Sequence, residues 1–188
     1  GAGARRVEVA HRVDWHEKHA LLKAAFPVDI LSPRATYHIA FGAVERTTHH
    51  NTDWDRARFE VPAHHWADLS EGDYGVSLLN DCKYGYDVHE NVLRLSLLRA
   101  PVDPDPHADE GAHEYTYALY PHAGDWRNGT VQQGFELNQP LLAKVAAAHP
   151  GKLPPAYAFA ALDADNIVLD TVKRAEDSDA IVVRLYEA

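Results

Sequence analysis

Apolar and polar residues alternate with a period of two along most of this sequence, and this pattern constrains the fold more than any other feature. Near the start, Val7, Val9, Val13 and Trp15 alternate with mostly polar residues. Successive side chains of a β-strand point to opposite faces, so the pattern predicts strands with one buried face. The same reading predicts about eleven strands, over residues 7–15, 20–26, 35–41, 56–63, 74–79, 91–99, 112–120, 131–137, 156–162, 166–172 and 181–186.

A helical pattern is confined to residues 140–149, where Pro140 can begin a short helix and Pro150-Gly151 would end it. The Pro- and Asp-rich stretch over 97–114 reads as a loop between two strands. The 188 residues are enough for one domain with a sizeable core. The sequence therefore predicts an all-β fold, a single antiparallel β-sandwich domain over residues 1–188 with long loops.

Charge and cysteine content narrow the class of partner. The formal net charge is −10, and the acidic residues are scattered. A nucleic-acid-binding surface would need a basic patch, so no nucleic-acid partner is expected. The sequence has no run approaching the roughly 18 apolar residues that span a bilayer, so no membrane partner is expected. The single cysteine, Cys82, excludes an internal disulfide and favours a cytoplasmic location.

The thirteen histidines raise the question of a metal site. "HEKH", from His16 to His19, has its histidines three apart and beside strands, whereas the zinc-protease pattern needs them four apart on a helix. The adjacent pairs at 49–50 and 64–65 would point to opposite faces of a strand. No metal ligand is therefore assigned, and Cys82, without a CxxC partner, is read as a structural thiol.

The four tryptophans leave two interpretations open. Trp15, Trp54, Trp66 and Trp126 each lie beside polar residues. In loops, such rings could stack on sugar faces, but for each ring taken singly a cap on an end of the sandwich core is the better interpretation. Acidic pairs occur too, but sequence spacing cannot place two carboxylates across a glycosidic bond. No catalytic residue is assigned.

The segment "NDCKYGYD", residues 80–87, is the strongest candidate site. A plain hairpin needs only two to five turn residues, yet this link carries two tyrosines, a lysine and the only cysteine. Either it is an elaborate turn, or it is a loop that reaches a ligand or another domain. The candidate residues are Asn80, Asp81, Lys83, Tyr84, Tyr86 and Asp87.

Several stretches resemble the C-terminal β region of glycoside hydrolase family 38, the α-mannosidases. They include "RVDWHEKHALLKAAFPVDI", "SPRATYHIAFGAVERTTHHNTDWDRARFEV", "AHHWADLSEGDYGVSLLNDCKYGYDVHENVLRLSLLRAP", "HEYTYALYPHAGDW" and "VKRAEDSDAIVVRLYEA". The resemblance covers nearly the whole chain in order. It implies a late, galactose-mutarotase-like β-sandwich portion of a larger retaining α-mannosidase, which hydrolyses terminal α-D-mannosides.

The resemblance also implies where the chemistry lies. Family members hold a catalytic zinc with His and Asp ligands, and use an Asp nucleophile, in an N-terminal domain that this sequence does not include. The expected partners are that catalytic domain of the same parent chain and a mannose-containing glycan; homo-oligomerisation is left open. No cofactor is expected in this chain itself. In the family, the loop matching 80–87 extends towards the catalytic cleft.

The expected function is therefore that of an accessory domain, inactive alone, that supports the catalytic domain and lines its cleft. The absence of methionine, even at position 1, and strands at both ends fit a piece of a longer protein. Two alternatives remain open: a free-standing carbohydrate-binding module, and a small mutarotase-like enzyme that uses a histidine and a carboxylate.

Overall fold

The computed structural model of the chain describes residues 3–188. By its internal contacts the chain divides into two compact units, Gly1–Gln139 and Pro140–Ala188. The first unit is a two-layered antiparallel β-sandwich, which confirms the all-β prediction. That residues 1–188 form one single domain stays a prediction.

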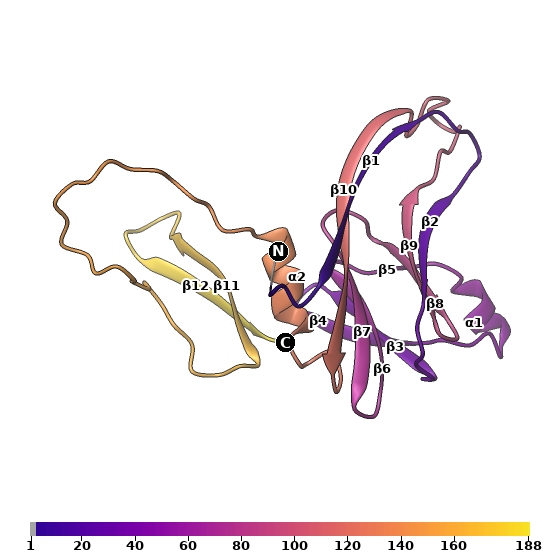
Figure 1. The fold of residues 1–188 in the computed structure, drawn as a ribbon, viewed down its shortest axis with the longest axis horizontal. Coiled ribbons are helices and arrows are strands. Elements are labelled where there is room, and N and C mark those ends of the chain that lie inside the picture. Colours follow the sequence, from indigo (N-terminus) through magenta and orange to yellow (C-terminus); the bar gives the residue numbers. More distant parts are fainter. Residues whose placement is uncertain (1–2) are drawn as a thin grey trace. The chain divides into compact units, whose positions relative to one another are not determined.

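One layer of the sandwich is a six-stranded sheet (Figure 1). Its strands, in spatial order, are β1 (Val7–Trp15), β10 (Gly111–Ala123), β7 (Tyr74–Asn80), β6 (Trp66–Glu71), β3 (Arg34–Ile39) and β4 (Gly42–Thr47). The edge strand β1 pairs with β10 along its whole length, from Val7 opposite Leu119 to Trp15 opposite Gly111. The predicted strand at 7–15 is therefore confirmed.

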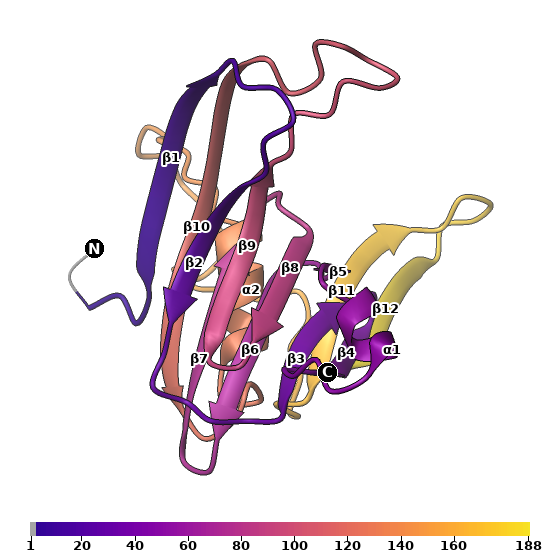
Figure 2. The same ribbon diagram turned by 90° about the vertical axis from the view of Figure 1, so that its right-hand side faces the viewer.

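The second layer is a four-stranded sheet that faces the first (Figure 2). Its strands, in spatial order, are β2 (Leu22–Pro27), β9 (Val92–Leu98), β8 (Gly85–His89) and β5 (Val61–Pro62). Alternate residues of both sheets meet in one apolar cluster between the layers. Tyr37 of β3 and Tyr86 of β8 illustrate the contact, because their rings meet edge to face with centroids 6.5 Å apart.

A helix, α2 (Thr130–Asn138), covers the outer face of the six-stranded sheet, where the sequence predicted a strand over 131–137. That prediction is wrong. Val131 and Leu137 pack against a second apolar cluster that includes Trp66. Gly134 makes the close approach possible, since a Cβ there would lie 3.0 Å from Trp66 Cδ1. Tertiary packing on this sheet face thus overrides the short apparent alternation.

The strand predicted over 56–63 is also mostly wrong. A short helix, α1 (Asp53–Ala57), takes its first part, and only β5 remains of the rest. A capping box explains the helix: the Thr52 hydroxyl accepts from the Asp55 amide at 3.1 Å, and the Asp55 carboxylate accepts from the Thr52 amide at 3.1 Å.

The second unit contains the antiparallel pair β11 (Ile167–Arg174) and β12 (Ile181–Glu187), so the strands predicted at 166–172 and 181–186 are confirmed. The helix predicted over 140–149 and the strand over 156–162 are wrong, because residues 140–166 form neither. A helix this short needs an apolar face packed on something, whereas Leu141, Leu142 and Val145 are almost fully exposed. Across the described residues, no helix is long and apolar enough to cross a membrane.

Candidate functional site

The segment 80–87 is a tight turn between two strands, shorter than the predicted loop. Strand β7 ends at Asn80 and β8 begins at Gly85, so only residues 81–84 lie outside the sheets. Tyr84 is 55% exposed, and Asp81 and Lys83 are partly buried. Asn80, Tyr86 and Asp87 are buried instead. The expectation of a projecting loop that includes Tyr86 is therefore wrong, and the exposed surface is confined to the turn.

Asn80 holds this turn together. Its Oδ1 accepts a hydrogen bond from the Lys83 amide at 2.6 Å, and its Nδ2 donates to the His64 carbonyl at 2.7 Å. Nδ2 also donates to the Tyr86 hydroxyl at 2.5 Å. An Asn side chain that bonds nearby backbone replaces a standard turn hydrogen bond, which explains why an amide residue begins this link. Asn80 is thus a buried residue that fixes the backbone conformation of the turn.

Tyr86 belongs to the core. Its ring is fully buried between the sheets, and its hydroxyl donates to the Leu78 carbonyl at 3.3 Å. Burial raises the pKa of this hydroxyl well above its ordinary value, so Tyr86 stays a neutral hydrogen-bonding group. It supports the turn through Asn80 and does not itself reach the surface.

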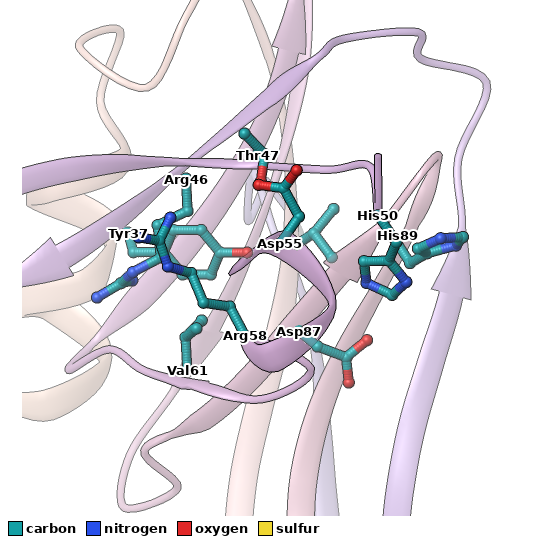
Figure 3. Close-up of a pocket in the computed structure, with 10 residues that line it drawn as sticks. Tyr37, Arg46, Thr47, His50, Asp55, Arg58, Val61, Asp87 and His89 are labelled. Atoms are coloured by element: carbon teal, nitrogen blue, oxygen red, sulfur yellow. The ribbon is translucent and has the colours of Figure 1, made fainter. Parts of the chain in front are cut away.

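Asp87 is held by two cations of the four-stranded sheet. One carboxylate oxygen accepts from Arg94 Nε at 2.5 Å, and the other pairs with Lys23 Nζ. The pairing satisfies a carboxylate whose side chain is only 7% exposed. Asp87 also lines a small pocket at the far edge of the sandwich (Figure 3).

Asp81 ties the turn to the neighbouring strand β10. Its Oδ2 accepts from the Thr116 amide at 2.8 Å, and its own amide donates to the Thr116 carbonyl at 3.1 Å. Its Oδ1 is buried and, among the residues that the structure describes, has no hydrogen-bond partner. A buried carboxylate oxygen left in this way costs free energy and is poised to accept a donor.

Lys83 lies over an aromatic ring that the sequence analysis did not assign to the site. Its Nζ is 4.5 Å from the centroid of Tyr115, on β10. The Tyr115 hydroxyl is buried and also lacks a partner within residues 3–188. The imidazole of His11, on β1, stacks on the same ring at 5.4 Å between centroids. Only the alternation in 112–120 hinted at Tyr115, and it cannot tell a site residue from a core residue.

Cys82 and Tyr84 form the exposed tip of the turn. The Tyr84 ring meets His64 edge to face at 6.1 Å between centroids. Burial and the neighbouring Asp81 raise the pKa of the Cys82 thiol to about 11, so the thiol stays protonated at neutral pH. Such a cysteine is a poor nucleophile. Of the two tip residues, Tyr84 therefore offers the better contact surface.

The four tryptophans take different positions. Trp66 is 1% exposed and stacks on Trp126 at 5.2 Å between centroids, under helix α2. Trp15 is partly buried at the end of β1. Only Trp54, on α1, is largely exposed, at 78%. Two of the rings thus pack on the outer face of the six-stranded sheet, not at an end of the sandwich core, and Trp54 is the most exposed of the four.

A buried polar cluster that no sequence motif indicates lies beneath α2. His122 Nε2 lies 2.7 Å from Asp68 Oδ2 and 3.2 Å from Ser77 Oγ, and Ser77 Oγ lies 2.7 Å from Thr130 Oγ1. The residue types match a hydrolytic triad, but the geometry does not: one imidazole nitrogen meets both partners, whereas a triad uses one nitrogen for each. All four residues are buried, so the cluster is structural.

The described residues contain no group of three or more His, Cys, Asp or Glu side chains that could hold a metal ion. Zinc is a four-coordinate ion with N, S and O ligands, so this part of the chain does not fit the metal that the family resemblance implies.

Comparison with known protein families gives two matches. Residues 2–107 match the family model described as the glycosyl hydrolases family 38 C-terminal domain. Residues 166–188 match a second model, the glycosyl hydrolases family 38 C-terminal beta sandwich domain. The first match covers every strand of the sandwich except β10, and it includes the turn at 81–84; the second match covers the pair β11–β12.

Relatives align with nearly the whole chain. It is 50% identical to alpha-mannosidase 2C1 of Homo sapiens over 192 residues, which covers 99% of the chain and 18% of the relative. An alpha-mannosidase of Saccharomyces cerevisiae is 40% identical, with 97% of the chain and 18% of that protein covered. An alpha-mannosidase from Enterococcus faecalis has a crystal structure that matches with a TM-score of 0.87 at 20% identity, over 98% of the chain and 22% of that structure. The chain thus spans about a fifth of the length of these proteins.

Proposed function

This chain belongs to the glycosyl hydrolases family 38 C-terminal domain family, and on that basis we propose that it is an accessory domain of an α-mannosidase. In this proposal the chain packs against a catalytic domain elsewhere in the parent polypeptide, and its 81–84 turn lines the substrate cleft. The observation that carries the proposal is coverage: 99% of the chain aligns with a mannosidase, yet it accounts for only 18% of that enzyme.

The chemistry of the turn supports a role at the cleft. Lys83 lies over the ring of Tyr115 and forms no salt bridge with any described residue, so its N–H groups can donate to a sugar hydroxyl or a carboxylate. Tyr84 exposes 55% of its surface beside it. An exposed ring next to an unpaired cation suits a sugar face or a domain interface. Beneath them, Asp81 Oδ1 and the Tyr115 hydroxyl have no hydrogen-bond partner among the described residues. In this proposal each of them can accept a hydrogen bond from a donor of the catalytic domain.

Zinc belongs to the proposal only through the parent enzyme. Glycoside hydrolysis needs two positioned carboxyl groups, and the α-mannosidases that this chain resembles also use a metal ion. The residues described here do not fit a metal site. We therefore place the zinc, the nucleophile and the general acid in the catalytic domain of the parent, with this chain contributing only contacts to its cleft.

The test compares the 188-residue chain with the full-length parent. We expect the parent to hydrolyse an aryl α-mannoside and to lose activity with a chelator, whereas the chain alone shows no turnover with or without zinc. Turnover by the chain alone would overturn the accessory role. If calorimetry instead detects mannose binding by the chain, while removal of this region leaves the parent's activity intact, a carbohydrate-binding module is the better description.

A further inference from the structure

A small pocket lies where the edges of the two sheets meet, beneath helix α1 (Figure 3). Its walls come from β3, β4, α1, β5 and β8, and its free volume is about 10 Å³, room for one water-sized group. Figure 3 places Arg46 and Arg58 at one end, against the ring of Tyr37. The imidazoles of His50 and His89 lie at the other end, with ring centroids 4.1 Å apart.

Arg46 is the first of two unpaired cations in this pocket. Its guanidinium lies 4.6 Å above the centroid of Tyr37, which fixes the plane of the group. Its Nη1 is buried and has no hydrogen-bond partner in the part of the chain that the structure describes. Burial lowers the pKa of Arg46, and so does the positive charge of Arg58. A buried N–H donor without an acceptor is costly, so an acceptor is expected here.

Arg58 is the second unpaired cation. It follows α1, its side chain is exposed, and its guanidinium forms no ion pair with any residue of 3–188. Two like charges in one pocket repel each other. A bound anion offsets this repulsion with its negative charge, whereas a water molecule has no net charge.

The two carboxylates in the pocket wall do not serve the arginines. Asp55 accepts from Thr47 Oγ1 at 3.1 Å and from Thr52 Oγ1 at 2.8 Å, and it also caps α1. Asp87 is paired with Lys23 and Arg94. Both carboxylates are thus held by other donors, and within residues 3–188 neither forms a salt bridge with Arg46 or Arg58.

We propose that Arg46 and Arg58 form a binding site for a small oxyanion from solution, such as inorganic phosphate. One oxygen enters the pocket and accepts from Arg46 Nη1, since the free volume admits only one atom of that size. The remaining oxygens stay at the mouth, where the exposed Arg58 closes on them. Guanidinium groups suit this ligand because their planar donors match two oxygens at once. With a chain charge of −10, long-range attraction does not favour anions, so binding depends on this local pair.

The experiment titrates inorganic phosphate into the 188-residue chain at constant ionic strength, followed by melting temperature and by NMR of the arginine Nε–Hε groups. We expect a saturable rise in Tm and shifts confined to Arg46 and Arg58. Arg58→Gln should weaken phosphate binding about tenfold to a hundredfold, the usual value of a hydrogen bond to a charged group. Arg56→Gln is the matched control, because Arg56 lies on α1, two residues before Arg58, but pairs with Asp53.

A second part of the experiment measures the Tm without any added ligand. Without phosphate and at low salt, Arg58→Gln should raise Tm or leave it unchanged, because it relieves the repulsion of Arg46. Equal phosphate responses in Arg58→Gln and Arg56→Gln would overturn the proposal, as would no saturable response in the wild type. If the chain binds phosphate but the full-length parent does not, the arginines face an acidic group of the parent, and the free-anion site is overturned.

Discussion

Nε2 of His122 lies 2.7 Å from Oδ2 of Asp68, and both side chains are only 1% exposed. Ser77 and Thr130 complete this buried cluster, which joins β6, β7 and β10 to the first residue of α2. Gly75 belongs to the same arrangement, because a Cβ at that position would lie 2.3 Å from His122 Cε1. The contact therefore couples the helix that covers the sheet to the sheet itself.

Asp68→Ala should destabilise the chain by about 1.5–3 kcal/mol, because it removes the buried carboxylate that His122 and Ser77 share and leaves them only their contacts with each other and with Thr130. Denaturant unfolding of the 188-residue chain measures this. Ser70→Ala is the control, since the Ser70 hydroxyl bonds only the outer oxygen of Asp68 and should cost about 1 kcal/mol. An equal decrease in the free energy of unfolding in the two variants would show that the cluster does not couple α2 to the sheet.

His38 should make stability depend on pH. Burial, with His65 and His64 nearby, lowers the pKa of His38 to about 4. The unfolded chain takes up a proton near pH 6.5, and the folded chain does so only near pH 4. Stability due to His38 is therefore complete above pH 6.5 and lost progressively between pH 6.5 and 4, by on the order of 3 kcal/mol.

Chemical denaturation at several pH values, followed by tryptophan fluorescence, measures this loss, because the His38 ring stacks on Trp66. His38→Gln should flatten the stability curve between pH 6.5 and 4. His149→Gln, at an exposed position where the ring contacts the carbonyl of Pro150, should leave the slope as in the wild type. An unchanged slope in His38→Gln would contradict the assignment.

Deletion of residues 1–15 should lower the melting temperature markedly. Strand β1 pairs with β10 along its whole length, so the deletion leaves the backbone of β10 unpaired and uncovers Tyr115 and Tyr117. Calorimetry of the truncated chain is the measurement. A Tm equal to that of the full chain would mean that β1 adds nothing to the sandwich.

The sequence predicts best those strands that have one solvent face. Strand β1 alternates because one face meets the core, and it was found with its observed bounds. Strand β6 was missed because Trp66 to Leu69 are all buried, between the core and α2, and such a strand shows no alternation. Strand β8 was missed for the same reason, since Tyr86, Asp87 and Val88 are buried in succession.

The same limit applies to the candidate site. The polar run at 80–87 located the turn, but it could not separate Tyr84, which is exposed, from Tyr86, which is a core residue. Nor could it reveal Tyr115 beneath Lys83, because the two residues meet only through the pairing of β7 with β10. Contacts between distant segments depend on register, and register follows from the whole sheet.

Substitutions in the turn should separate a role at the cleft from a role in folding. In the full-length parent, Lys83→Ala and Tyr84→Phe should each lower kcat/KM, because they remove a free cation and an exposed hydroxyl from the proposed cleft. In the 188-residue chain, Tyr84→Phe should leave the Tm nearly unchanged. Lys83→Ala should cost only about 0.5–1 kcal/mol, the usual value of a cation–π contact.

Tyr74→Phe is the matched control for Tyr84→Phe. Tyr74 is also an exposed tyrosine, 39% accessible, but it begins β7 at the end opposite to the turn. It should change neither the kinetics of the parent nor the stability of the chain. If Lys83→Ala and Tyr84→Phe instead unfold the 188-residue chain and spare the kinetics of the parent, the turn is structural. Because Asn80 and Asp81 already anchor its backbone, we expect the kinetic effect.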